Sequence, residues 1–315
     1  MKIVILDKST LGADADLSPI RNLGECVEYD TTEYDLVNER IKDADVVVIN
    51  KIKMNAETLK DAKNLKLICV AATGYDNIDT EYCKENGIAL YNVPGYSTDS
   101  VAQVTLSMVL SLATHLWQYR DFVHSGKYSV SGVANKLTPV YHEIAGMTWG
   151  VIGGGAIGGK VAKIAEAFGC NVLVCRRKQE GEFALADVDT ICEQADIISV
   201  HLPLSDTTKG IISRERIEKM KPTAIFVNTA RGAVADEHAL ADAIRNNKLG
   251  GLGVDVYSTE PFPTDHPYTD ILGFDNVCLT PHMGWGAFEA RNRCVRKIAE
   301  NITNFYRNEN KNRIV

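Results

Sequence analysis

The segment Thr148–Gly158, TWGVIGGGAIG, places a glycine-rich turn between an apolar run and a stretch with helical spacing, Lys160–Phe168. Gly153, Gly155 and Gly158 fit the pattern G-x-G-x-x-G. In that pattern the first glycine permits a tight turn, the second lets the backbone approach a pyrophosphate, and the third lets helix and strand pack closely. The segment therefore predicts a dinucleotide-binding turn, with a plain glycine-rich turn as the alternative. The predicted contacts are Gly153, Gly155, Ala156, Ile157 and Gly158.

Short apolar runs alternate with helical stretches on both sides of this turn. Many of the runs are apolar on both faces, which suits parallel sheets that helices cover on both sides. The alternation predicts an α/β protein with doubly wound parallel sheets. The predicted strands are Lys2–Asp7, Asp45–Asn50, Lys66–Ala71, Ala89–Asn92, Thr148–Ile152, Asn171–Cys175, Ile197–His201, Ala224–Asn228, Gly250–Val256 and Asn276–Leu279.

Two sheets fit a chain of 315 residues better than one. The Pro/Gly and Ser/Thr/Asp cluster of Asn92–Ser100 is typical of a crossover that ends at a helix N-cap. Val101–Tyr119 reads as one long helix, and the amphipathic segment Phe288–Tyr306 is expected to return to the first domain. We predict a Rossmann dinucleotide-binding domain, residues 99–287, inserted in a flavodoxin-like substrate-binding domain, residues 1–98 and 288–315.

The composition narrows the class of partner. The 34 Lys and Arg against 41 Asp and Glu give a net charge of −7, which argues against nucleic acid. No stretch approaches the roughly 18–20 apolar residues of a membrane span, and MKIVILDKST, which Asp7 interrupts, reads as a strand and not as a signal peptide. The eight cysteines form no C-x-x-C pair or Cys/His cluster, which predicts buried free thiols and no metal site. We expect a cytoplasmic protein with a small-molecule partner.

Residues 120–144 have weak periodicity and carry Phe122, Tyr128 and Tyr141. They predict either an arm that embraces a second subunit or an ordinary surface loop. The first interpretation implies a homodimer.

The end of the strand Asn171–Cys175 bears on the choice of cofactor. Dinucleotide folds that bind NAD usually place Asp or Glu there for the adenosine ribose, whereas here Arg176, Arg177 and Lys178 follow. Guanidinium groups suit a 2′-phosphate. A charge pair near 4 Å is worth about 4 kcal/mol at an effective dielectric of 20, before desolvation is subtracted. The sequence therefore favours NADP, with NAD possible; a solvated basic run without cofactor contact is the alternative.

Three later segments each carry one functional candidate: NTARG contains Arg231, VDVYSTEP contains Glu260, and LTPHMGW contains His282. With a dinucleotide turn, these side chains form the set needed to reduce a 2-oxo acid. The guanidinium would bind the substrate carboxylate, the imidazole would deliver a proton, and the carboxylate would keep the imidazole charged. Singly, each has a structural interpretation: a surface turn for Arg231, and a helix or turn boundary for Glu260.

These motifs resemble those of the D-isomer-specific 2-hydroxyacid dehydrogenases. AATGYDNID (residues 71–79), NVPGYSTDSVAQ (residues 92–103) and DIISVHLPLSDTTKGII (residues 196–212) are similar to family signatures, and they and the three catalytic segments follow in family order along nearly the whole chain. The resemblance implies a two-domain α/β fold, usually dimeric, that reduces a 2-oxo acid to the D-2-hydroxy acid with a nicotinamide cofactor.

Matched position by position, the resemblance implies that Arg231 binds the substrate carboxylate and 2-oxygen, that His282 is the proton donor, and that Glu260 fixes its tautomer. Asp255 would orient the nicotinamide; a strand-end cap is its structural interpretation. Lys51 would contact the substrate carboxylate or remain a solvated strand-end lysine. Backbone N–H donors for that carboxylate would come from Ala72, Thr73 and Gly74. The remaining cofactor contacts implied are His201, Pro203, Thr207, Thr229, Ala230, Arg231, Asp255, His282 and Gly284.

The subgroup is indicated by the 71–79 loop, the Asn50-Lys51 pair, NVPGYST and Trp285. Together these resemble hydroxypyruvate and glyoxylate reductases, also called glycerate dehydrogenases, more than phosphoglycerate dehydrogenases. A dehydrogenase of a bulkier 2-oxo acid is an alternative, and so is a dinucleotide-sensing, corepressor-like binding protein. Gln103 and Asp99 depart from the family pattern, and neither is expected to abolish the chemistry.

Overall fold

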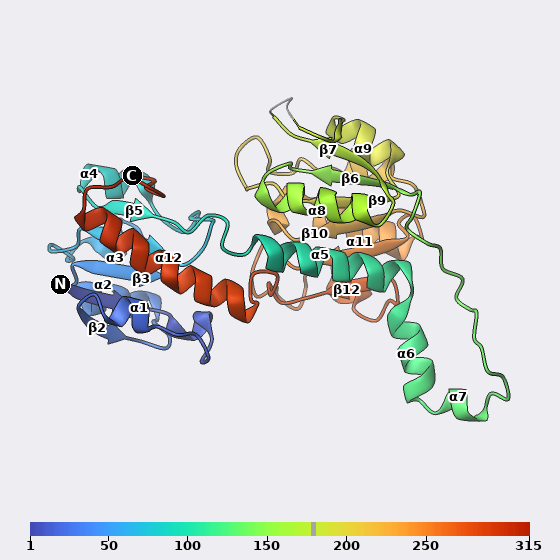
Figure 1. Ribbon diagram of the computed structural model, residues 1–315, viewed down its shortest axis with the longest axis horizontal. Helices are drawn as coiled ribbons and strands as arrows, with labels where there is room; N and C mark the ends of the chain where they lie inside the picture. Colours follow the sequence, from blue (N-terminus) through green and yellow to red (C-terminus); the bar gives the residue numbers. More distant parts are fainter. Residues whose placement is uncertain (178–180) are drawn as a thin grey trace. The chain divides into compact units, whose positions relative to one another are not determined.

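The computed structural model describes residues 1–177 and 181–315 (Figure 1). Contacts between residues divide the chain into two compact units. The first unit consists of Met1–Ser97 and Trp285–Val315, and the second consists of Thr98–Gly284. Each unit is built on its own parallel sheet.

The first unit has a five-stranded parallel sheet in the order β2-β1-β3-β4-β5. This is the flavodoxin-like order, so the predicted fold class of this unit is confirmed. Its strands are β1 (Lys2–Ile5), β2 (Glu25–Glu28), β3 (Val46–Ile49), β4 (Leu67–Val70) and β5 (Ala89–Tyr91). Its helices are η1 (Lys8–Leu11), α1 (Ser18–Arg21), η2 (Tyr34–Leu36), α2 (Val37–Ile41), α3 (Ala56–Leu59), α4 (Thr80–Glu85) and α12 (Phe288–Tyr306).

Alternate residues of the first sheet enter two different cores. Val46 and Val48 pack with Val295 and Ile298 of α12 on one face. Their neighbours Val47 and Ile49 pack on the other face, in a core that also contains residues of α2 to α4. Because side chains alternate along a strand, a strand buried on both faces must be continuously apolar, and VVVI of β3 is.

The second unit has a seven-stranded parallel sheet in the order β12-β11-β10-β9-β6-β7-β8. Six of its strands have the Rossmann order, as predicted. Its strands are β6 (Thr148–Ile152), β7 (Asn171–Cys175), β8 (Ala184–Leu185), β9 (Ile197–Val200), β10 (Ile225–Asn228), β11 (Gly251–Val254) and β12 (Val277–Leu279). Its helices are α5 (Thr98–Ala113), α6 (Leu116–His124), α7 (Lys127–Val130), α8 (Ala156–Ala167), α9 (Val188–Gln194), α10 (Arg214–Glu218), η3 (Gly232–Val234), α11 (Glu237–Arg245) and η4 (Thr269–Ile271).

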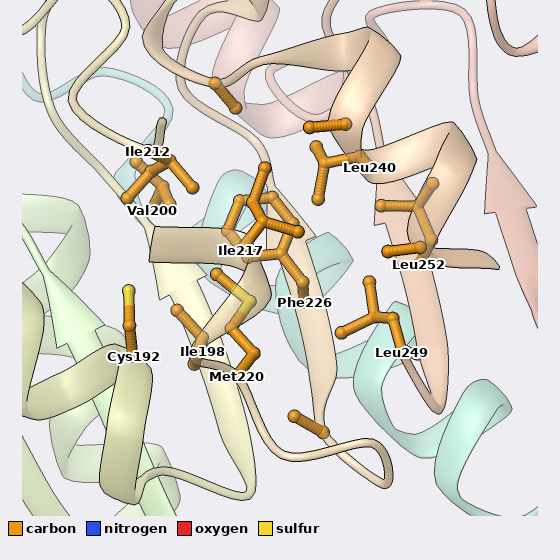
Figure 2. Packing of buried hydrophobic residues seen from close by; sticks show 14 of the residues in the cluster. Cys192, Ile198, Val200, Ile212, Ile217, Met220, Phe226, Leu240, Leu249 and Leu252 are labelled. Carbon is orange, nitrogen blue, oxygen red and sulfur yellow. The ribbon is translucent and has the colours of Figure 1, made fainter. Parts of the chain in front are cut away.

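Two apolar layers hold this second sheet. On one face Phe226 and Ile198 of the sheet pack with Ile217 of α10 and Leu240 of α11 (Figure 2). On the other face the sheet packs against α5 and α8. Complete burial of a side chain such as Phe226 contributes about 1.5–3 kcal/mol. These layers fix the carboxyl ends of the strands, where the candidate site lies.

One predicted helix is wrong in extent. The expected helix Val101–Tyr119 is two helices, α5 and α6, bent by 67° at a break between them. His115 at the break has a left-handed backbone with φ of 51°, which an α-helix cannot contain. The apolar spacing continues across the break, so the sequence pattern did not reveal it. Within the described ranges no single helix is long and apolar enough to span a bilayer, although the bent α5–α6 pair meets the length and composition criteria jointly.

Candidate functional site

The dinucleotide turn lies between β6 and α8, and the N–H groups of Gly153 and Gly154 donate to the Cys175 carbonyl at 2.9 and 3.2 Å. Gly153 has φ of 106°, and a Cβ there would lie 2.7 Å from the His201 carbonyl carbon and oxygen. A Cβ on Gly158 would lie 1.9 Å from the Gly153 carbonyl oxygen. A Cβ on Gly155 would meet no atom of the described protein within 4 Å. The turn therefore needs its first and third glycines for the fold itself, while the second borders open space that a phosphate could approach.

A pocket of about 470 Å³ adjoins this turn, and its lining includes the cations Lys160, Lys163 and Arg176. The Nε and Nη2 atoms of Arg176 are buried and have no hydrogen-bond partner in the part of the chain that the structure describes. Lys160 lies 3.2 Å from Asp99, one of the residues that depart from the family pattern. A buried guanidinium without acceptors is costly, and an anion at this place would satisfy it.

Arg177 contacts the loop after β9, where its Nη2 donates to Thr207 Oγ1 at 3.4 Å. Pro203 belongs to the same loop, and its carbonyl accepts from Thr208 Oγ1 at 2.6 Å. Lys178, the third cation of the predicted basic run, lies outside the described residues. The predicted contacts after β7 and after β9 thus lie at the carboxyl edge of one sheet, on either side of β6.

His201 follows β9 and is partly exposed, but both of its ring nitrogens are buried. Burial lowers the pKa of His201 to about 3, so its imidazole is neutral near pH 7. Within the described residues neither ring nitrogen has a hydrogen-bond partner. Because a proton donor must hold its proton at working pH, this burial argues against His201 as the acid.

The predicted acid–base pair forms a short contact: His282 Nδ1 lies 2.6 Å from Glu260 Oε2. A carboxylate is an acceptor, so Nδ1 carries the hydrogen, and Nε2 is then the nitrogen that could exchange a proton with a ligand. The other carboxylate oxygen, Oε1, accepts from the Tyr257 N–H at 3.1 Å. His282 has φ of 52°, a left-handed backbone that costs free energy in a non-glycine residue and is found disproportionately at active sites.

Asp255 holds the loop that carries His282. Its buried carboxylate accepts from Thr280 Oγ1 at 2.6 Å and from the N–H groups of Met283 and Gly284 at 2.8 and 2.7 Å. Burial raises the pKa of Asp255, and the hydrogen bonds and the His282 charge act in the opposite direction. Asp255 therefore anchors the loop after β12, which agrees with the strand-end cap given above as its structural interpretation.

Arg231 follows β10, in a loop that is held by hydrogen bonds among residues 228–231. Asn228 Nδ2 donates to the Arg231 carbonyl at 2.9 Å, and the Ala230 N–H donates to Asn228 Oδ1 at 3.0 Å. Arg231 Nη1 donates to the Ala230 carbonyl at 2.8 Å, and Thr229 Oγ1 lies 3.0 Å from Thr105 Oγ1.

Arg231, Glu260 and His282 follow β10, β11 and β12, which are adjacent parallel strands. Carboxyl ends of adjacent parallel strands meet at one edge, so the structure brings the three loops together in the second unit.

The predicted substrate contacts Lys51, Ala72, Thr73 and Gly74 lie in the first unit, after β3 and β4. The Lys51 N–H donates to Asp7 Oδ2 at 2.7 Å, and burial raises the pKa of Asp7. Thr73 Oγ1 donates to the Val93 carbonyl at 3.1 Å. Both loops therefore have fixed backbones at the carboxyl edge of the first sheet.

Reasoning from sequence missed several residues that shape these loops. Asp7 was noted only as an interruption of an apolar run, although a strand-end carboxylate is a common anchor for a neighbouring turn. Tyr257 lies inside the VDVYSTEP segment and was given no role. Glu237 and His266, which meet at 3.1 Å, gave no sequence signal because 29 positions separate them.

Comparison with known proteins places these features in a family. Residues 106–284 match the family described as D-isomer specific 2-hydroxyacid dehydrogenase, NAD binding domain. The chain is 36% identical to a hydroxypyruvate reductase of Blautia hydrogenotrophica over 97% of both chains, and 36% identical to a glycerate dehydrogenase of Methylorubrum extorquens over 96% of both. A solved structure of an acyclic imino acid reductase in complex with NADPH and D-Arg superposes with a TM-score of 0.86 and 27% identity, covering 100% of each chain. The dinucleotide turn, the three gathered loops and these alignments agree, and the chain belongs to the D-isomer-specific 2-hydroxyacid dehydrogenases, a family of oxidoreductases.

Proposed function

We propose that the protein reduces a small 2-oxo acid, hydroxypyruvate or glyoxylate, to the D-2-hydroxy acid with NADPH. The observation that carries the proposal is the 2.6 Å contact between His282 Nδ1 and Glu260 Oε2, on the sheet that also carries the dinucleotide turn. The names of the relatives, hydroxypyruvate reductase and glycerate dehydrogenase, support the choice of substrate.

The roles of the second unit's residues follow from their chemistry. A bound nicotinamide supplies the hydride. Arg231 binds the substrate carboxylate and 2-oxygen through its planar guanidinium. His282 donates a proton from Nε2 to the 2-oxygen, and Glu260 stabilises the imidazolium that this step requires. Asp255 keeps the His282 loop in place through its three hydrogen bonds.

The first unit is proposed to be the substrate-binding domain. The N–H groups of Ala72, Thr73 and Gly74 would donate to the substrate carboxylate, with Lys51 as a further cation. The support is their position at the carboxyl edge of a parallel sheet, where α/β proteins bind ligands. The hydrogen bonds of Asp7 and of Thr73 preorganise these two loops.

The cofactor preference is proposed to rest on Arg176 and Arg177, which would bind the 2′-phosphate of NADPH. Within the described residues the buried Nε and Nη2 atoms of Arg176 have no acceptor, which supports this role, because a phosphate would supply acceptors. A close charge pair is worth roughly 4 kcal/mol, and about a third of that free energy would be enough for a tenfold preference for NADPH over NADH.

A matrix of NADH and NADPH against glyoxylate, hydroxypyruvate, pyruvate and phenylpyruvate tests this function. We expect the KM of NADPH to be at least about tenfold below that of NADH, with turnover highest on the two small polar acids. Replacing Arg176 and Arg177 together with alanine should raise the KM of NADPH about tenfold or more and leave that of NADH within about threefold. The control is Arg214→Ala, which breaks a surface ion pair with Asp242 in the same unit. Tighter binding of NADH by the wild type would overturn the NADP preference.

The same matrix decides between the alternatives. Preference for phenylpyruvate would indicate a dehydrogenase of bulkier 2-oxo acids. Binding of NADPH with no turnover of any 2-oxo acid would favour a dinucleotide-sensing binding protein.

A homodimer formed by the segment 116–141 is also proposed. This segment comprises α6, α7 and the chain that follows, and it exposes apolar side chains along its length. The exposed residues are Leu116, Trp117, Val123, Tyr128, Val130, Val133, Leu137, Val140 and Tyr141. Apolar exposure on this scale is typical of an interface.

Sedimentation of the wild type is expected to give a dimer, because burying this apolar surface is favourable. Replacing Val130 and Leu137, which are 84% and 78% exposed, with aspartate should shift the mass to that of a monomer. Leu272→Asp, at an exposed leucine outside the segment, is the control and should remain dimeric. A monomeric wild type at micromolar concentration would contradict the proposal.

A further inference from the structure

The turn that carries Glu260 is held by groups to which the mechanism above gives no role. Tyr257 begins this turn, just after β11. Its N–H donates to Glu260 Oε1 at 3.1 Å, and its hydroxyl donates to the Thr280 carbonyl at 2.9 Å. That carbonyl also accepts the N–H of His282 at 3.0 Å. One residue therefore contacts the carboxylate of the pair with its backbone and the loop of the imidazole with its side chain.

The loop of Arg231 packs against the same residue. A Cβ on Gly232 would lie 2.0 Å from the carbonyl carbon of Tyr257 and 2.1 Å from the nitrogen of Ser258. Only glycine, which has no Cβ, allows the two backbones to approach this closely at position 232. Tyr257 is consequently the point at which the loops after β10, β11 and β12 meet.

Two residues on either side of Glu260, Ser258 and His266, contact the carboxylate of Glu237 at the start of α11. Glu237 accepts from the Ser258 N–H at 2.9 Å and from the Ser258 hydroxyl, and it lies 3.1 Å from His266 Nε2. Because the Tyr268 N–H donates to His266 Nδ1 at 3.3 Å, Nε2 carries the hydrogen and donates to Glu237. Ser258 precedes Glu260 in sequence and His266 follows it. Hydrogen bonds to the Glu237 carboxylate therefore hold the chain on both sides of Glu260.

Aromatic rings of the residues in and after the turn pack against one another, and those of His266 and Tyr268 are buried. The centroids of Tyr257 and Phe262 are 4.8 Å apart, and those of Phe262 and His266 are 4.9 Å apart. Burial, followed by the nearby carboxylates of Asp255 and Glu260, raises the pKa of Tyr257. Its hydroxyl therefore remains a hydrogen donor throughout the neutral range.

We propose that Tyr257 and Glu237 are positioning residues that hold the Glu260 carboxylate against Nδ1 of the His282 imidazole. This inference rests on the proposed function for its kinetic consequence. Catalytic groups must be held within about 0.5 Å of their productive geometry by the residues around them. A displaced Glu260 would still be present but would stabilise the imidazolium less.

Among the described residues, Glu260 contacts the His282 ring and the Asp255 carboxylate interacts with its charge, while Arg231 lies in the loop after β10 and Glu237 accepts from Ser258. Weakening the hold on Glu260 changes the nearest of these. A carboxylate beside an imidazolium favours the charged form, so loosening that contact should stabilise the charged form less.

The test is Tyr257→Phe, which removes one hydroxyl and keeps the ring. We expect kcat for reduction to fall about three- to tenfold, since a single hydrogen bond is lost. The basic limb of the kcat/KM profile should move to lower pH, while the Kd of NADPH stays within about twofold. The control is Tyr268→Phe, which removes a hydroxyl from a neighbouring buried ring of the same cluster and should change neither readout. Glu237→Gln removes the negative charge of the carboxylate that accepts from Ser258 and His266. This variant should move the basic limb of the kcat/KM profile in the same direction.

A second measurement separates this inference from the proposed function. The pH titration of the His282 ring by NMR needs no turnover, and it should shift to lower pH in Tyr257→Phe relative to the wild type. An unchanged titration together with an unchanged kinetic profile in both Tyr257→Phe and Glu237→Gln would overturn the positioning role. A shifted titration in a protein that reduces no 2-oxo acid would keep the positioning role and reject the function.

Discussion

Replacing His282 with alanine is expected to lower kcat for 2-oxo acid reduction by about 10²–10⁴-fold, the usual contribution of a general acid. Without the imidazole, the charge that develops on the 2-oxygen must be neutralised by water. Binding of NADPH should change little, because the dinucleotide turn follows β6 and the His282 loop follows β12, with β9, β10 and β11 between these two strands in the sheet. Steady-state kinetics gives the first quantity, and fluorescence titration of NADPH gives the second.

The matched control is Met283→Ala in the same loop. Met283 is half-exposed, and its contribution to the loop is its N–H donation to Asp255, which alanine retains. This variant should keep nearly wild-type kcat. Reduction by the wild type should also slow as pH rises, because His282 loses the proton that it donates. Full turnover in His282→Ala would remove His282 from the mechanism, and a flat pH profile limited by chemistry would contradict its role as the acid.

Alanine at Gly158 and alanine at Gly155 are expected to damage the protein in different ways. A Cβ on Gly158 would lie 1.9 Å from a backbone oxygen of Gly153, so α8 and β6 would have to separate. Overpacking of this kind typically costs about 1–3 kcal/mol, and the melting temperature without cofactor should fall by about 4–10 °C. NADPH binding should be lost as well, since the turn itself is displaced.

Gly155→Ala serves as the matched control, because its Cβ meets no described protein atom within 4 Å. The melting temperature without cofactor should stay within about 2 °C of the wild type. The added methyl group would occupy the space proposed for the pyrophosphate, so the stabilisation that NADPH gives should shrink. Thermal unfolding with and without NADPH measures both effects. Equal stabilisation of Gly155→Ala and wild type by NADPH would place the pyrophosphate elsewhere.

The sequence predicts the interior of the fold well because buried parallel strands are apolar on both faces. Thr148–Ile152, Asn171–Cys175 and the helix Phe288–Tyr306 have the predicted bounds. Strand β2 was missed because its sequence, ECVE, carries charge at both ends and pairs along one edge only. Strand β8 was missed because it consists of only two exposed residues.

The candidate site likewise contains residues that the sequence predicts and residues that it does not. Arg231, Glu260 and His282 each lie in a short motif, so local patterns are enough to find them. The residues that hold them are contacts between loops, and those contacts depend on β10, β11 and β12 being neighbours in the sheet. Strand order is a property of the whole domain, so no local pattern could indicate that Glu237 and Ser258 meet.

The adjacency of β10, β11 and β12 has a practical consequence for redesign. The loops that carry Arg231, Glu260 and His282 lie between positions 228 and 284, after three neighbouring strands of the second unit. A chimera that exchanges the segment before position 98 would inherit this assembly intact. Under the proposed division of roles, libraries that seek new substrate selectivity can begin with the segment before position 98 and leave the Arg231 anchor unchanged.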